Sequence, residues 1–230
     1  MKLNESQIDQ LYLFTRQHFV EHYDVQTELV DHLANAIEAQ GLLFPNRTFG
    51  EALQIEFKKF GVFGFMEVVE KRQAALNKKY AKIVWSHFKR FFRLPQIIGT
   101  FSAGGILFLI LKISSYSDII FTTIAIVFLL IFFVELFRTA RKLKKNNEQT
   151  GKKWLFKDII FGYGQVAGFS YLPFQFIFQI NQHLNNDFTL FLGSFFIVAV
   201  ALCQYIILVL IPKKAEQYLK ATYPEYQFVD

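Results

Sequence analysis

Four long apolar runs dominate the second half of the chain. They cover residues 94–113, 119–137, 155–180 and 188–211. Each run meets or nearly meets the roughly 20 residues that a helix needs to cross the hydrocarbon core of a bilayer. Helices buried in a large water-soluble core are the alternative, but four such runs in one short chain make it the weaker interpretation. The pattern therefore predicts four transmembrane helices within residues 94–211.

The first 75 residues have a different pattern, in which apolar positions recur with a helical period. Three signals for helix starts accompany them: Ser6 with Asp9, which resembles a capping box; Asp24 as a cap; and Thr48 with Glu51, a full capping box. Gly41 is expected to end the second helix, and a long helix is expected to start near Phe65. Residues 1–75 are therefore predicted to form a small helical domain, and the whole chain is predicted to be all-α.

Residues 76–93 join the two regions, and they are basic and aromatic. A helical wheel over residues 80–93 separates an apolar, aromatic-rich face from a face with the cations Lys82, Lys89, Arg90 and Arg93. A calmodulin-type target helix or a nucleic-acid-binding helix would be similarly charged, but the apolar run that follows directly favours the bilayer. We expect an interfacial amphipathic helix with its cations near anionic lipid headgroups, and no nucleic-acid partner.

The formal net charge of +6 is unevenly distributed. Residues 1–75 are acidic, whereas basic residues gather in 76–93, in 138–154 and directly after the last apolar run. Cytoplasmic connections of membrane proteins are enriched in Lys and Arg, so these three basic segments are expected on the cytoplasmic side. The opening residues show no signal-peptide pattern. We therefore predict that both termini, including a short tail at 212–230, lie in the cytoplasm.

The third apolar run is the only one with a polar stripe. One sector of its helical wheel contains Asp158, Gln165, Gly168, Gln175 and Gln179. Gly164 and Gly168 form a G-x-x-x-G pattern that permits close helix approach, and Pro173 is expected to bend the helix. Polar groups are costly against lipid, so this face is expected to meet protein or water. Two interpretations stay open: a polar cavity or pathway, and a packing interface between helices.

Candidate chemistry is sparse elsewhere in the chain. His18 and His22 are spaced i, i+4, and His32 would add a third metal ligand, although helix surface and interhelical hydrogen bonding is the favoured interpretation. The lone Cys203 lies in an apolar run, where a thiolate is unfavourable. The phosphate-loop, zinc-protease and serine-hydrolase motifs are absent from the sequence. We expect no enzymatic activity, no cofactor and no metal.

Residues 8–75 resemble the HAAS-type helical domain found at the N-terminus of many bacterial multi-pass membrane proteins. The runs that carry the resemblance are ELVDHLANAIE (28–38), FGEAL (49–53) and FKKFGVFGF (57–65). The resemblance implies a cytosolic domain that precedes transmembrane helices and is often encoded near transcriptional regulators, and it implies no enzymatic activity. Together with the charge pattern it places the protein in a bacterial inner membrane.

Two functions follow as expectations. The first is a non-enzymatic membrane protein whose cytosolic helical domain binds or regulates a protein partner, as an adaptor, an accessory subunit or a signalling component. The second is a small transporter, channel or lipid-handling protein that uses the polar face of the third span. Anionic lipids and a protein are the expected partners, and the sequence is compatible with a homo-oligomer.

Overall fold

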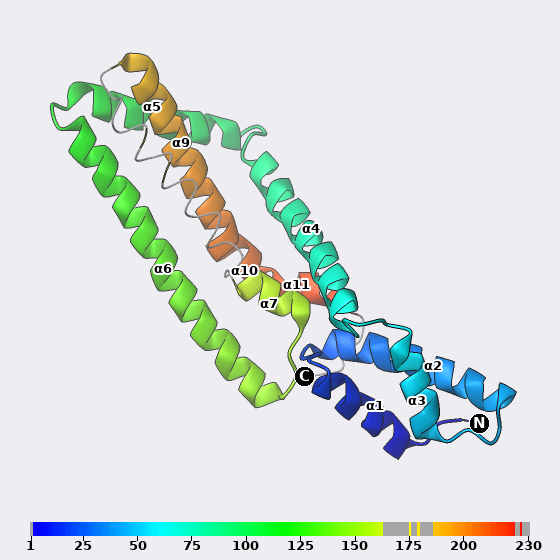
Figure 1. The fold of residues 1–230 in the computed structure, drawn as a ribbon. Coiled ribbons are helices and arrows are strands. Elements are labelled where there is room, and N and C mark those ends of the chain that lie inside the picture. Colours follow the sequence, from blue (N-terminus) through cyan, green and yellow to red (C-terminus); the bar gives the residue numbers. More distant parts are fainter. Residues whose placement is uncertain (1, 163–174, 176–178, 180–185, 224–225, 227–230) are drawn as a thin grey trace. The chain divides into compact units, whose positions relative to one another are not determined.

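The computed structural model describes most of the chain, and every element within the described residues is a helix (Figure 1). The described residues are 2–162, 175, 179, 186–223 and 226. The chain divides into two compact units: Met1–Lys78 with Asn147–Asp158, here called the helical unit, and Lys79–Asn146 with Ile159–Asp230, here called the membrane unit. The all-α prediction is confirmed for the described residues.

The helical unit contains α1 (Glu5–Gln17), α2 (Tyr23–Leu43), α3 (Phe49–Lys58) and the first half of α4 (Met66–Arg90). The predicted periodicity of α2 is confirmed, because its apolar positions are buried: Val25, Leu29, Val30, Leu33 and Ile37. Aromatic rings from three parts of the chain pack together beside them, namely Phe14, Phe57, Phe60 and Phe65. Full burial of one such side chain contributes roughly 1.5–3 kcal/mol.

Side-chain caps set where the first and third helices begin. The capping box predicted at Thr48 and Glu51 is confirmed at the start of α3. The start predicted at Ser6 with Asp9 is wrong, because Asn4 is the N-cap of α1. The Asn4 side chain accepts the backbone N–H of Gln7 at 2.9 Å, and the Gln7 side chain accepts the N–H of Asn4 at 3.0 Å. Gln7 provides the amide three residues after the cap that a capping box requires, which Asp9 does not provide.

α4 is one continuous helix of 25 residues, Met66–Arg90. The interfacial helix predicted over 76–93 is therefore not a separate element but the second half of α4. Residues 66–90 contain neither glycine nor proline, so nothing in the sequence stops a helix that has started at Met66. The start of this helix agrees with the one predicted near Phe65.

The membrane unit contains three helices long and apolar enough to cross a bilayer: Gln96–Ile113, Ser117–Lys145 and Asp187–Lys213. They correspond to α5 (Gln96–Ile113), to α6 (Ser117–Thr150), and to α9 (Asp187–Tyr205) continued by η1 (Ile206–Leu210) and α10 (Ile211–Lys213). Three of the four predicted spans are therefore confirmed as candidates. The third predicted span, 155–180, begins with α7 (Leu155–Phe161), and most of its remainder lies outside the described residues.

The second span does not end at residue 137, as predicted, but continues as a helix to Thr150. The segment 138–150 is polar and basic, but it contains no glycine or proline, so a change in polarity alone does not end the helix. Helix α6 ends directly before Gly151, a typical glycine stop. Glu135 pairs with Arg138 at 2.9 Å, as expected from their spacing.

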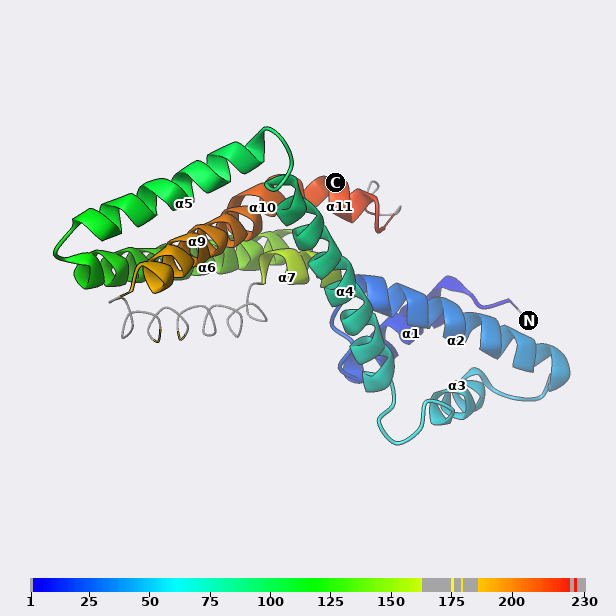
Figure 2. The same cartoon turned by 90° about the horizontal axis from the view of Figure 1, so that it is seen from above.

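α5 and α9 pack against each other within the membrane unit (Figure 2). Gly104 provides the close approach, because a β-carbon there would lie 2.7 Å from the ring of Phe195. The buried core around this contact consists of Leu111, Phe121, Ala125, Leu190 and Ile197. At one end of the pair, Lys112 Nζ lies 2.5 Å from a carboxylate oxygen of Asp187, and the two side chains form an ion pair.

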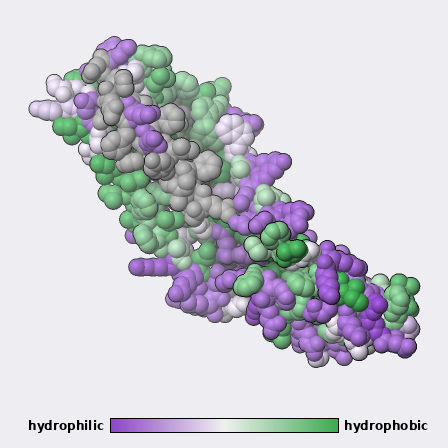
Figure 3. All heavy atoms as spheres, in the orientation of Figure 1, coloured by the Kyte–Doolittle hydropathy of each residue, from purple (hydrophilic) through white to green (hydrophobic). Residues whose placement is uncertain are grey.

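The two units differ in surface character. Figure 3 shows hydrophobic side chains spread over the long helices, whereas the helical unit is mainly hydrophilic with a few hydrophobic groups. The membrane-unit surface is apolar along all three candidate spans, as a lipid-facing surface must be. Together these observations support a multi-pass membrane protein.

Candidate functional site

A segment of the chain that follows α6 and includes the start of the third predicted span binds to the start of α2. We call residues 152–158 the docking segment. The backbone N–H of Tyr23 donates to the carbonyl of Lys153 at 2.7 Å, and the N–H of Leu155 donates to a carboxylate oxygen of Asp24 at 3.0 Å. These two hydrogen bonds hold the docking segment at the first turn of α2, although more than 125 residues separate the partners along the chain.

The centre of the docking segment is apolar and buried. Trp154 is 2% exposed, and Leu155 and Phe156, the next two residues, are equally inaccessible. The indole ring of Trp154 meets the ring of Tyr23 edge-on, with the centroids 5.4 Å apart. Lys152 Nζ lies 4.3 Å from the centroid of the same Tyr23 ring, which is cation–π distance. Burial of three large side chains makes apolar contact the main source of stability in this site.

Charged pairs surround this apolar centre. Lys153 Nζ lies 2.7 Å from a carboxylate oxygen of Glu21, and its hydrogen bond and charge lower the pKa of the Glu21 carboxyl. His22 Nε2 lies 3.1 Å from an oxygen of Asp158. The Glu21 and Lys153 side chains are both substantially exposed, so solvent screening leaves their pair worth about 0–1 kcal/mol. These charged pairs align the docking segment with α2 more than they stabilise it.

Asp24 has a different role from the one predicted for it. It was expected to cap α2, but the N-cap of that helix is His22, which makes no side-chain capping hydrogen bond. Asp24 lies inside α2, is 5% exposed, and directs its carboxylate to the N–H of Leu155, the first residue of α7. It therefore satisfies a free amide at the start of a distant helix. No local sequence signal identifies such a partner.

The three histidines considered as metal ligands have separate environments. His18 bonds the carbonyl of Phe14 at 2.8 Å and packs against Phe57, His22 pairs with Asp158, and the ring of His32 faces Phe60. Within the described residues, no group of three or more potential metal ligands occurs. The interhelical and surface roles favoured from the sequence agree with these contacts.

The polar face predicted for the third span is only partly described. Asp158 belongs to the helical unit, where it binds His22. Gln175 and Gln179 are helical, exposed residues. Gln165, Gly164, Gly168 and Pro173 lie outside the described residues. The choice between a polar pathway and a packing interface stays a prediction.

The basic residues predicted at the membrane surface, Lys82, Lys89, Arg90 and Arg93, are all exposed. Trp85 is also largely exposed, stacks on Phe88 and has Lys89 Nζ 5.4 Å from its ring centroid. The buried side of this half of α4 contains Tyr80 and His87. The sequence did not single out His87, because an isolated histidine between aromatic residues carries no signal of its partner.

One polar contact inside the membrane unit was also missed. The Gln204 side chain, near the end of α9, donates to the backbone carbonyl of Phe128 in α6 at 3.3 Å. The five residues Ile206–Leu210 that follow are π-helical, a geometry frequent at functional or strained positions. Gln204 lies in a run that we treated as uniformly apolar, and a single glutamine there was the only available signal.

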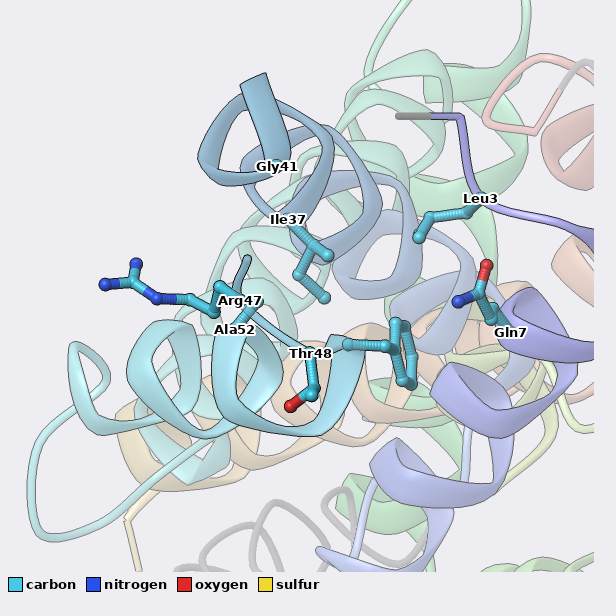
Figure 4. Close-up of a pocket in the computed structure, with 8 residues that line it drawn as sticks. Leu3, Gln7, Ile37, Gly41, Arg47, Thr48 and Ala52 are labelled. Atoms are coloured by element: carbon cyan, nitrogen blue, oxygen red, sulfur yellow. The ribbon is translucent and has the colours of Figure 1, made fainter. Parts of the chain in front are cut away.

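A small hollow lies in the helical unit, near the start of α1 and the turn between α2 and α3 (Figure 4). Residues from four segments line it, among them Leu3, Ile37 and Ala52. Its volume of about 20 Å³ is enough for about one water molecule. The hollow is therefore too small for an organic substrate.

No known protein family, curated protein or solved structure matches the chain. The resemblance to the HAAS-type domain therefore stays a prediction based on the three sequence runs. The fold and the docking site define the class of the molecule: a helical protein with three candidate membrane spans and a compact helical unit that includes the segment following α6.

Proposed function

We propose that this is a non-enzymatic inner-membrane adaptor. Its helical unit lies in the cytoplasm, binds a protein partner and couples that binding to the membrane spans. The docking segment is the observation that carries this proposal. It includes the start of α7 (Leu155–Phe161), the first part of the third predicted span. A partner that shifts α2 acts directly on residues 153–158 through the bonds of Tyr23 and Asp24.

The partner surface that we favour is the turn between α3 and α4. Val62 and Phe63 are 98% and 75% exposed, while Phe65, two residues later, is buried in the aromatic cluster. Gly61 and Gly64 have φ angles of 76° and 53°, the left-handed region that glycine enters without strain. The turn thus has a defined backbone that directs two apolar side chains into solvent.

Phe19 adds a second apolar group from the end of α1. It is 85% exposed and has a φ of 65°, a rare conformation for a bulky residue. The preceding residue, His18, packs on Phe57 and Phe65, so Phe19 extends from the same aromatic cluster that anchors the α3–α4 turn. A strained backbone that exposes an aromatic ring is a reason to propose a functional contact.

The chemistry of the partner follows from this surface. Exposed apolar side chains fit an apolar pocket, and Lys58 at the end of α3 is exposed and makes no ion pair with any described residue. We therefore favour a protein partner that has an apolar pocket with an acidic rim. A few well-packed anchor residues of this kind typically provide most of the binding free energy of an interface.

The test is site-specific photo-crosslinking of the full chain in its native membrane. A photoreactive residue replaces Phe63 in one variant and Leu42, an equally exposed residue near the end of α2, in the control. We expect one protein adduct from position 63 alone. The identified and purified partner should bind the full chain and lose at least about tenfold in affinity with Phe63→Asp, as for other interface anchors. Lipid adducts, or equal adducts at both positions, would contradict the proposal.

The transport alternative rests on the polar face of the third span. Most of that face lies outside the described residues, and none of the described contacts favours a pathway over a packed interface. The adaptor proposal is the one that the described contacts support.

A further inference from the structure

The C-terminal helix α11 (Ala215–Lys220) packs beside the second half of α4 within the membrane unit (Figures 1 and 2). His87 Nε2 and the Tyr218 hydroxyl lie 2.7 Å apart, and Lys79 Nζ donates to the Thr222 hydroxyl at 2.8 Å. Leu219, the residue after Tyr218 in α11, is buried. The junction between α4 and α11 is therefore a built interface with polar groups inside it.

Positive charge gathers around this junction. Burial lowers the pKa of His87, and the nearby charges of Lys214 and Arg90 lower it further. Arg90 is also close enough to Tyr218 to act on the pKa of its hydroxyl, which burial raises. Within the part of the chain that the structure describes, no carboxylate forms an ion pair with Arg90 or Lys214. Among the described residues, two cations thus lie close to a hydroxyl without an ion-paired carboxylate.

His87 holds the Tyr218 hydroxyl in place at the junction. The residue is 5% exposed, and its Nδ1 atom is buried without a hydrogen-bond partner among the described residues. When Nε2 carries the His87 proton, it donates to the Tyr218 hydroxyl oxygen, and the Tyr218 hydroxyl proton is then free to bind a phosphate oxygen.

The junction lies at one edge of the membrane spans. Lys112 and Asp187 pair at the far end of α5 and the start of α9, so the start of α5 and the end of the last span share the opposite edge. Arg90 precedes α5 by six residues, and Lys214 directly follows the last span. This is the level at which lipid headgroups lie, and basic pockets between spans at that level bind anionic headgroups.

Apolar surface suited to acyl chains lies beside the cations. Phe91, next to Arg90, meets the ring of Tyr205 edge-on at 6.4 Å, and Tyr205 is about half exposed. Phe101, in the second turn of α5, is exposed as well. A free phosphate ion would use only the cations, whereas a phospholipid uses both the cations and this apolar surface.

We propose that Arg90, Lys214 and Tyr218 form a binding site for the phosphate of an anionic phospholipid at the α4–α11 junction. The site is independent of the proposed adaptor function. It differs from general attraction of a basic helix to a negative membrane, because it uses one side of α4 together with the C-terminal helix. Lys82 and Lys89 provide the matched comparison, since they lie on the same helix but form no hydrogen bond or ion pair with α11 among the described residues.

The test is titration of the full chain in detergent with phosphatidylglycerol, followed by native mass spectrometry. We expect saturable binding of phosphatidylglycerol and none of phosphatidylcholine. Arg90→Gln with Lys214→Gln should weaken binding by about tenfold to thirtyfold, whereas Lys82→Gln with Lys89→Gln, an equal loss of charge, should change it less than about twofold. Tyr218→Phe keeps the charge and should still weaken binding by about threefold.

Three results would overturn the proposal. If the two double variants weaken phosphatidylglycerol binding equally, the lipid is held by diffuse attraction to basic residues. If Tyr218→Phe leaves binding unchanged, the hydroxyl is not part of the site. Displacement of phosphatidylglycerol by equimolar inorganic phosphate would mean a free-phosphate site. Tyr218→Phe also provides a result if the charge variants fail to fold.

Discussion

The helical unit and the membrane unit are both built from helices, but different interactions fix their arrangement. In the helical unit, buried polar side chains form specific hydrogen bonds: Gln26 donates to the carbonyl of Val20 at 2.5 Å, and Gln40 accepts from Arg47 at 2.6 Å while it donates to Glu56. In the membrane unit, the contact of α5 with α9 depends on shape, with Gly104 opposite Phe195. In the proposed topology, water surrounds the first unit and lipid surrounds the second, which accounts for this difference.

The same comparison changes what an exposed apolar side chain means. Ile113 in α5 is as exposed as Phe63 in the α3–α4 turn. Lipid covers the first in a membrane, so its exposure requires no other explanation. Nothing comparable covers the second in water, where a contiguous apolar patch marks an interaction site. Exposed apolar residues of the helical unit are therefore candidates for a partner contact, and crosslinking from Phe63 against Leu42 tests which of them makes one.

The largest effect is expected where a buried polar group of the helical unit loses its role. Asp24→Ala removes the acceptor of the Leu155 N–H and should lower the free energy of unfolding by about 2–3 kcal/mol. Asp31→Ala, at an exposed position of the same helix, should change it by less than about 0.5 kcal/mol. Thermal unfolding of the purified full chain in detergent measures both. Equal stability of the two variants would show that Asp24 does not hold the docking segment.

Shape is the sensitive property of the membrane unit. Gly104→Leu places a side chain where the ring of Phe195 lies and should destabilise the chain by about 1–3 kcal/mol. Gly105→Leu is the matched control, since a β-carbon at position 105 meets nothing within 4 Å. Unfolding in detergent should separate the two variants, and an equal melting temperature would mean that α5 and α9 do not pack through Gly104.

A polar contact between spans should matter less than shape. Gln204→Leu removes the hydrogen bond to the Phe128 carbonyl and should lower stability by about 0.6 kcal/mol, the average for hydrogen bonds between membrane helices. Unfolding in detergent by a graded denaturant detects a change of this size. A loss above about 2 kcal/mol would place polar specificity in the membrane unit too, and the contrast between the units would fail.

The exposed pair of Glu21 and Lys153 should have the smallest effect. The pKa of the Glu21 carboxyl is lowered in the folded state. The pair therefore stabilises the fold above pH 4.5, the ordinary pKa of the group, and this stabilisation is lost as the pH falls through the lowered pKa. After solvent screening we expect at most about 0.5 kcal/mol. Glu21→Gln should therefore change the free energy of unfolding little at pH 7. It should also remove the small loss of stability that the unmodified chain shows near pH 4. A larger loss at pH 7 than Asp24→Ala gives would reverse the order of contributions proposed for this site.

Local patterns in the sequence predict most of the helices. The apolar period of α2, the capping box at Thr48 and three of the four spans are all determined by residues within a few turns of one another. Contacts between distant segments were not predictable in this way. Asp24 has a typical capping residue type, and only the folded chain shows that its carboxylate caps α7 rather than α2. His87 and Tyr218 are 131 residues apart in the sequence, and no local sequence pattern predicts that they pair.

Burial of Trp154 tests most directly whether the helical unit holds the docking segment. The chain has two tryptophans, and Trp85 is exposed, so Trp85→Phe leaves Trp154 as the only indole. In the full chain, the account predicts blue-shifted emission that acrylamide quenches poorly, and a red shift with stronger quenching when Asp24→Ala is added. Emission typical of indole in water before that second substitution, with full access to acrylamide, would contradict the account.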